Sequence, residues 1–236
     1  TYEPIILDLD DGKKVEITGK IDRLDLAKTP DGKYIRIIDY KSSVKNIDLN
    51  EVQAGMQIQL LTYLDATCKI EEVMPAGLLY FNLLDPVIKA KKPMSDEQIE
   101  EEIQKNFKMN GLILADVNIV KMMDKKLETG ASDVIPAYID KEGNLSKKSS
   151  SITKSQFEDL QKYTNKIIKQ ISKEILKGKI DIEPSYNVKN KKTPCTYCEY
   201  KPICGFKAGT CGNKYNYIFT KEKDRILEEI KENVEK

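Results

Sequence analysis

The sequence predicts an α/β fold with a mixed central sheet flanked by helices, and three observations lead to this prediction. Residues 5–41 alternate short apolar runs with Asp-Gly turns, which is typical of antiparallel strands. Residues 50–67 then show the apolar spacing of an amphipathic helix. The segment "PAGLLYFNL" at 75–83 has the composition of another buried strand. Because the connection is long enough for a crossover, the returning strand can pair in parallel.

The first strands are expected to form a meander. Residues 5–9 and 15–21 form a predicted hairpin around Asp11-Gly12, and residues 34–41 follow the Asp31-Gly32 turn. The spacing of these segments predicts three antiparallel strands. One helix is expected next, over Asn50 to Thr67.

Three more helices complete the predicted scaffold. Ser95, with Gln98 three residues later, forms a capping box that begins a helix. A long amphipathic helix follows from Phe157 and ends at Gly178, and the last helix covers 221–235. Residues 129–151 are rich in Ser, Gly and Lys and predict a surface excursion. We therefore expect a core at 1–128, this excursion, and a C-terminal part at 152–236 that completes the same domain.

Composition limits the possible functions. The chain has 236 residues, 40% hydrophobic and 33% charged, which is enough to bury a core. The absence of histidine excludes imidazole bases and histidine-containing zinc sites. A net charge of +1 excludes a globally basic nucleic-acid binder.

No apolar run approaches the roughly 20 residues of a membrane span, and the N-terminus lacks a signal-peptide pattern. We therefore expect a soluble, cytoplasmic protein that does not bind membranes. Because the chain starts at Thr1, directly before a predicted strand, we also expect it to be a piece of a longer protein.

Charged residues gather at the end of the apolar run "IRIIDYKSS", residues 35–43. Asp39 and Lys41 lie two positions apart and so project from the same side of a buried strand, and we expect both to project from one edge of the sheet and not to pack in the core. Asp22, in the preceding strand, can join them. Two carboxylates suit Mg²⁺, with Mn²⁺ as a substitute, and the lysine can position an attacking water. A surface ion pair of little energetic weight is the alternative for the Asp-x-Lys pattern alone.

A basic segment lies near the C-terminus. The segment from Val188 to Lys214 contains six lysines and only one acidic residue, Glu199, and aromatic residues lie among the lysines. Lysines neutralise phosphates and rings stack on bases, so the segment is a candidate DNA surface, with a solvated loop as the alternative. The lysines assigned to DNA are Lys189, Lys191, Lys192 and Lys201.

Five cysteines, an odd number, argue against a disulfide framework. Cys195, Cys198 and Cys204 have C-x2-C-x5-C spacing, which indicates a metal centre. Cys211 could complete a four-cysteine zinc site.

Three ordered motifs carry a family resemblance. "GKIDRLD" (19–25), "IIDYKSS" (37–43) and "GMQIQLLTYL" (55–64) resemble the PD-(D/E)XK nuclease superfamily, in its helicase-linked branch typified by RecB and AddB. "FKMNGLILADVNIVKMMD" (107–124) and "CTYCEYKPICGF" (195–206) are similar to the AddB branch, so the resemblance covers nearly the whole chain. It implies a restriction-endonuclease-like fold, with the site residues Asp22 and Asp39 as metal ligands, Lys41 as the catalytic lysine, and Gln59 and Tyr63 as the Q-x-x-x-Y motif.

The resemblance also implies a role. It suggests a DNA exonuclease domain that degrades one strand beside an AddA-type helicase-nuclease partner, in double-strand break repair by recombination. It implies a [4Fe-4S] cluster held by the three clustered cysteines and a fourth cysteine upstream of this chain. Ser42 is expected to contact phosphate. The family's acidic or histidine residue upstream of the first motif has no match here, since Glu3 lies too close to the first strand.

Three other functions stay open at this point. The first is a stand-alone iron-sulfur exonuclease of the CRISPR-adaptation type. The second is an inactive nuclease fold that only binds DNA. The third is a zinc-stabilised binding module built around residues 186–217.

Overall fold

The computed structural model describes residues 4–9, 12–84, 86–88, 92–210 and 212–236, and the chain forms two compact units. The first unit contains the stretch up to Ile5, Glu16–Ile47 and Gln59–Gln161. The second contains Ile6–Val15, Asp48–Ile58 and Lys162–Lys236. Each unit therefore draws on separate stretches of the sequence.

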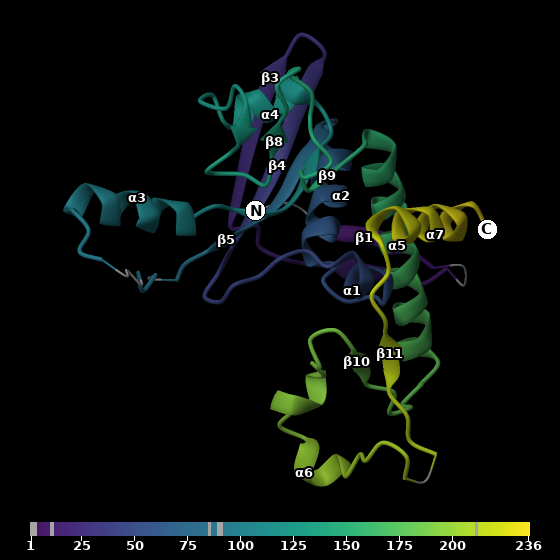
Figure 1. The fold of residues 1–236 in the computed structure, drawn as a ribbon. Coiled ribbons are helices and arrows are strands. Elements are labelled where there is room, and N and C mark those ends of the chain that lie inside the picture. Colours follow the sequence, from purple (N-terminus) through teal and green to yellow (C-terminus); the bar gives the residue numbers. More distant parts are fainter. Residues whose placement is uncertain (1–3, 10–11, 85, 89–91, 211) are drawn as a thin grey trace. The chain divides into compact units, whose positions relative to one another are not determined.

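A five-stranded mixed sheet forms the centre of the first unit (Figure 1). The antiparallel β3–β4 pair is followed by a parallel β4–β5 pair, an antiparallel β5–β6 pair and a parallel β6–β9 pair. The predicted α/β class is confirmed, and so is the parallel pairing of the segment at 75–83, which forms β5 beside β4. The strands are β3 (Arg23–Thr29), β4 (Gly32–Lys41), β5 (Met74–Asn82), β6 (Asn110–Leu114) and β9 (Ser151–Ile152).

A buried apolar cluster covers one face of this sheet. Ile38, Leu79 and Ile113 from β4, β5 and β6 pack with Val120 of helix α4 (Val117–Met123). Three side chains from the segment predicted as a surface excursion complete the cluster, so part of that segment belongs to the core. They are Ile135, Ala137 and Ile139, next to the short strands β7 (Gly130–Ala131) and β8 (Tyr138–Ile139).

The first predicted hairpin pairs as expected, but the predicted meander is wrong after it, because residues 34–41 pair with β3 and not with the second strand of that hairpin. Strands β1 (Ile5–Asp8) and β2 (Lys14–Ile17) pair in a separate two-stranded sheet, and β2 ends before β3 begins at Arg23. The β3–β4 ladder ends where Arg23 faces Ile38. Beyond that pair, the backbone N–H of Tyr40 donates to the Asp22 side chain instead of to a strand. Asp11, part of the predicted hairpin turn, lies outside the described residues.

The predicted helix over 50–67 is also wrong, because it is interrupted. Helix α1 covers Leu49–Gln53 and helix α2 covers Gln59–Glu71. Between them, Gly55 has φ +77° and Gln57 has φ +52°, and a right-handed helix cannot contain left-handed residues. Helix α2 lies against β4 and β5, with Leu60, Leu61 and Leu64 buried.

The remaining predicted helices are confirmed. Helix α3 (Asp96–Asn106) begins with the complete Ser95–Gln98 capping box. Helix α5 (Lys154–Leu176) ends just before Gly178, which has φ +72°. Helix α7 (Lys223–Glu235) buries Ile226, Leu227 and Ile230. None of the described helices combines the length and apolar character needed to cross a membrane.

The second unit has little regular structure outside its helices. Strands β10 (Ser185–Asn187) and β11 (Asn216–Ile218) form a parallel pair. Between them lie a 3-10 helix, η1 (Pro194–Tyr197), and the short helix α6 (Lys201–Cys204). Helix α7 packs against α1 in this unit, and both helices contribute fully buried side chains, Val52 and Ile230.

Candidate active site

Strand alternation on β4 places Asp39 and Lys41 side by side. The Nζ atom of Lys41 lies 2.5 Å from Oδ2 of Asp39 and 5.7 Å from the centre of the Tyr80 ring on β5. Asp39 is only 5% exposed, so the expectation that both side chains project from the sheet edge without packing in the core is wrong for Asp39. It is wrong because β5 pairs with β4 along the whole end of the strand, opposite both residues.

The Asp22 side chain reaches the same strand end. Its Oδ2 accepts a hydrogen bond from the backbone N–H of Tyr40 at 3.0 Å, and Tyr40 lies between Asp39 and Lys41 in the chain. The structure thus brings two carboxylates and one ammonium to the end of β4. These are the three residues that the first two motifs single out.

Gln59 and Tyr63 lie one helical turn apart on α2, and Gln59 Nε2 donates to the Tyr63 hydroxyl at 3.1 Å. The Tyr63 ring packs over Gly19, where an added Cβ would lie 2.5 Å from the ring carbon Cε1. Among the described residues, neither Gln59 nor Tyr63 is joined to Asp39 or Lys41 by a hydrogen bond or ion pair. Their link to the site instead runs through the segment that leads from Gly19 to Asp22.

The residues present at this strand end fit a hard cation. Asp39 Oδ2 is buried and accepts no hydrogen bond of good geometry from the described residues, although the Lys41 ammonium lies beside it. An acceptor in that state can be satisfied by a metal ion. Within the described residues, no three metal-binding side chains gather at one point. Two carboxylates nevertheless suffice for Mg²⁺, which keeps several waters and shares substrate phosphates.

Two neighbours of the site were not predicted from the sequence. Asn82 of β5 pairs with Lys41, is 6% exposed and accepts a hydrogen bond from the Lys45 backbone N–H at 2.9 Å. Gly19 matters only because of the ring packed on it. Asn82 could have been found from the sequence, because it is a polar residue at the end of an apolar run. Ser42, the predicted phosphate contact, is exposed just beyond β4.

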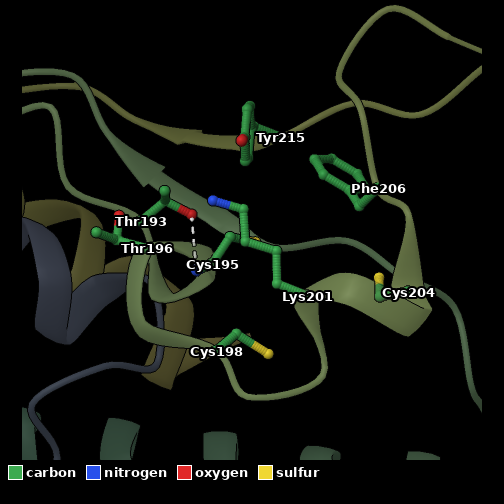
Figure 2. Close-up of a pocket in the computed structure, with 8 residues that line it drawn as sticks. All are labelled: Thr193, Cys195, Thr196, Cys198, Lys201, Cys204, Phe206 and Tyr215. Atoms are coloured by element: carbon green, nitrogen blue, oxygen red, sulfur yellow. Dashed lines mark hydrogen bonds between the residues drawn. The ribbon is translucent and has the colours of Figure 1, made fainter.

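The three clustered cysteines line one pocket of about 130 Å³ in the second unit (Figure 2). Cys195 is half-buried, while Cys198 and Cys204 are exposed. Thr193 begins helix η1 and its hydroxyl accepts from the Cys195 backbone N–H at 3.4 Å. The other lining residues are Thr196, Lys201, Phe206 and Tyr215.

Thiolates suit a zinc ion or an iron-sulfur cluster, so the donor set fits both groups in kind. The three thiols do not converge on one point in the part of the chain that the structure describes. Cys211, the alternative zinc ligand, lies outside the described residues. The fifth cysteine, Cys68, lies on α2, where burial raises the pKa of its thiol to about 11.

The predicted DNA-binding lysines all lie on the surface of the second unit. None of the four forms an ion pair with a carboxylate that the structure describes, so their charge is available to a ligand. Three of them, Lys189, Lys191 and Lys192, lie in a loop that the buried Asn187 holds in place.

Asn187 Oδ1 accepts from the backbone N–H groups of Lys189 and Asn190, at 3.1 and 3.3 Å. Its Nδ2 donates to Glu51 of α1 at 2.8 Å. Sequence reasoning missed Asn187, because an asparagine in a lysine-rich stretch gives no sign of being buried.

Comparisons with known proteins identify the family of the chain. Residues 1–205 match the family model described as the PD-(D/E)XK nuclease superfamily. An ATP-dependent helicase/deoxyribonuclease subunit from Clostridium kluyveri is 46% identical over 242 aligned positions, covering 99% of this chain and 21% of that protein. The corresponding protein from Acetivibrio thermocellus is 44% identical, covering 95% of this chain and 20% of its own length. The one from Bacillus thuringiensis is 41% identical, covering 98% and 20%. This chain thus spans about one fifth of the length of these relatives.

Proposed function

Because the chain belongs to the PD-(D/E)XK nuclease superfamily, we propose that it is a metal-dependent deoxyribonuclease that hydrolyses phosphodiester bonds of one DNA strand. One observation carries the proposal: at the end of β4, Lys41 lies beside Asp39, and Asp22 accepts a hydrogen bond from the backbone of Tyr40 between them. This combination provides oxygen ligands for a cation and a positive charge at one place.

The three side chains have distinct roles in this proposal. Asp22 and Asp39 hold Mg²⁺, or Mn²⁺ in its place, and the bound ion supplies Lewis-acid activation of water and phosphate. Lys41 positions the attacking water and offsets the negative charge that develops on the phosphate. The hydrogen bond between Gln59 and Tyr63 fixes the ring over Gly19 and so supports the segment that carries Asp22.

We further propose that the domain works within an AddAB-type helicase-nuclease, as an exonuclease beside an AddA-type partner in double-strand break repair by recombination. This proposal is supported by relatives whose names describe them as subunits of an ATP-dependent helicase/deoxyribonuclease. Cys195, Cys198 and Cys204 are proposed to hold a [4Fe-4S] cluster together with a cysteine upstream of this chain.

Degradation of end-labelled linear DNA in Mg²⁺ or Mn²⁺ tests the nuclease. The Asp39→Asn and Lys41→Ala variants should each lose at least about 100-fold in rate, since each removes a charged group at the reacting centre. Lys33→Ala is the matched control, because Lys33 is an exposed lysine on the same strand. If Asp39→Asn cleaved as fast as the wild type, the assignment would be wrong.

Metal binding is measured separately, by Mn²⁺ electron paramagnetic resonance without DNA. Asp39→Asn should weaken Mn²⁺ binding, whereas Asp133→Asn, an exposed carboxylate elsewhere in the first unit, should not. DNA binding without any metal binding or cleavage would favour an inactive nuclease fold.

The cysteine centre has its own test, namely iron, sulfide and zinc content per chain. An N-terminally extended chain should contain iron and sulfide, and Cys198→Ser should lower both. Zinc in their place would support the zinc-stabilised module.

A further inference from the structure

A row of aromatic rings runs along strand β11 and the residues directly before and after it. Tyr215, Tyr217 and Phe219 lie two positions apart, so they share one face of the strand. Consecutive ring centres lie 6.0 Å and 6.1 Å apart. Tyr186 pairs with Tyr217 in the neighbouring strand β10, with ring centres 5.8 Å apart, and Phe206 packs on Tyr215 at 5.0 Å. We call these five residues the aromatic row.

Tyr217 and Phe219 of the aromatic row are exposed on the second unit, while the other three rings are half-buried. Two of the residues that alternate with the row, Asn187 and Ile218, are 5% and 7% exposed, whereas the third, Asn216, is exposed. On the outer face, Tyr217 is 52% exposed and Phe219 is 62% exposed. Adjacent large aromatic residues left in water mark a binding surface. The contacts between the rings also fix their positions before any ligand arrives.

Positive charge accompanies the aromatic row. Lys214 directly precedes Tyr215, and six lysines with one acidic residue lie between Val188 and Lys214. The Lys201 side chain extends across the cysteine pocket that Tyr215 and Phe206 also line (Figure 2). A ligand with aromatic faces and negative charges matches both features, and a nucleic acid strand has both.

The polar groups beside the rings are already occupied within the protein. A hollow of about 190 Å³ is lined by Tyr217, Phe219, Asn50 and Gln53, among others. Asn50 Oδ1 accepts from the Lys221 backbone N–H, and Gln53 Oε1 and Nε2 bind Lys221 and Glu229. Rings whose neighbouring amides are engaged in this way favour stacking on any base over recognition of one base.

We propose that the aromatic row is a stacking platform for the bases of single-stranded DNA, with Tyr217 and Phe219 as its main contacts. The proposal rests on the nuclease function proposed above and specifies the form of its substrate. Bases in a duplex are already stacked and paired, so only an unpaired strand offers its faces. Two rings about 6 Å apart span roughly two stacked nucleotides, at about 3.4 Å per nucleotide. The lysines provide contacts to the phosphates.

The test is fluorescence anisotropy of a labelled oligothymidylate with the whole chain in EDTA, where cleavage is absent. Tyr217→Leu and Phe219→Leu should each weaken binding about tenfold, because each removes a stacking face. Tyr217→Phe keeps the ring and should bind within about twofold of the wild type. Ile180→Ala is the control, because Ile180 is a 90% exposed apolar residue of the same unit that lies outside both the basic segment and the aromatic row.

An abasic strand of the same length separates stacking from charge. On the abasic strand, where no ring has a base to stack on, the wild type and Tyr217→Leu should bind equally weakly. The proposal is overturned if Tyr217→Leu binds oligothymidylate as tightly as the wild type, or if its loss is equal on the abasic strand or on duplex DNA. This binding assay needs neither metal nor cleavage, so it is independent of the nuclease assay. An inactive Asp39→Asn variant that still binds oligothymidylate more tightly than the abasic strand would support the stacking platform. The nuclease function is then decided by the cleavage assay alone.

Discussion

The Asp22 carboxylate accepts a hydrogen bond from the Tyr40 backbone N–H at 3.0 Å, at the point where the β3–β4 ladder has ended. The side chain thus takes the place that a backbone carbonyl would hold in a longer strand. One carboxylate oxygen of Asp22 therefore caps the strand end at Tyr40, the residue that follows Asp39 in the chain. Asp22 therefore has a structural role and a proposed chemical role, and two substitutions separate them.

Asp22→Asn retains an oxygen for the Tyr40 N–H but loses the charge. We expect an almost unchanged thermal midpoint and a loss of cleavage of at least about 100-fold. Asp22→Ala loses the hydrogen bond as well and should cost about 1 kcal/mol of stability. Thermal unfolding and the cleavage assay measure the two effects. Equal stability of both variants would show that the hydrogen bond contributes little.

Gly19→Ala should disturb the site without touching a charged residue. The added methyl carbon would lie 2.5 Å from Cε1 of Tyr63, so the ring must move, at a cost of about 1–3 kcal/mol. We expect slower cleavage and a lower thermal midpoint. In a double-mutant cycle, Tyr63→Ala should make Gly19→Ala nearly neutral for stability. Additive effects would mean that the ring does not pack over Gly19.

Gly111 of β6 allows a close approach between strands. A Cβ there would lie 2.1 Å from the Leu78 backbone oxygen, and its φ is +148°. Because backbone cannot yield as a side chain does, Gly111→Ala should cost about 3 kcal/mol or more. Gly143→Ala is the control, since Gly143 also has a positive φ but no atom within 4 Å, and it should cost only about 1 kcal/mol. Chemical denaturation compares the two variants.

Acid should weaken the second unit through Glu229 of α7. Hydrogen bonds from Lys221 and Gln53, with Arg225, hold the pKa of Glu229 at about 2, below its usual 4.5. A lowered folded-state pKa contributes stability at pH values above the unfolded value, and this contribution is lost as pH falls from about 4.5 to about 2.

Glu229→Gln should therefore lower the thermal midpoint at neutral pH, and the difference from the wild type should shrink across that acidic range. Glu232→Gln, at an exposed position on the same helix, is the control. A difference that stayed constant down to pH 2 would contradict the assignment.

The features that were predictable from sequence depend on short-range patterns. The Ser95–Gln98 capping box and the alternation of Asp39 and Lys41 involve residues within a few positions, so their geometry follows from spacing. The break between α1 and α2 was not predictable, because the apolar spacing continues across Gly55 and nothing marks Gln57 as left-handed. The bond from Asp22 to Tyr40 and the contact of Tyr63 with Gly19 arise only when distant segments meet.

The division of the chain into two units has a consequence for how it is made. The second unit takes Ile6–Val15 and Asp48–Ile58 from early in the sequence, yet its largest part, Lys162–Lys236, comes last. On a ribosome, the early stretches must therefore remain without their final packing partners until Lys162–Lys236 has been synthesised. The stretches of the first unit that carry Asp22 and Asp39 are complete by Gln161. We therefore expect the strand end with the candidate active site to fold during translation, before the second unit, which carries the aromatic row, can fold.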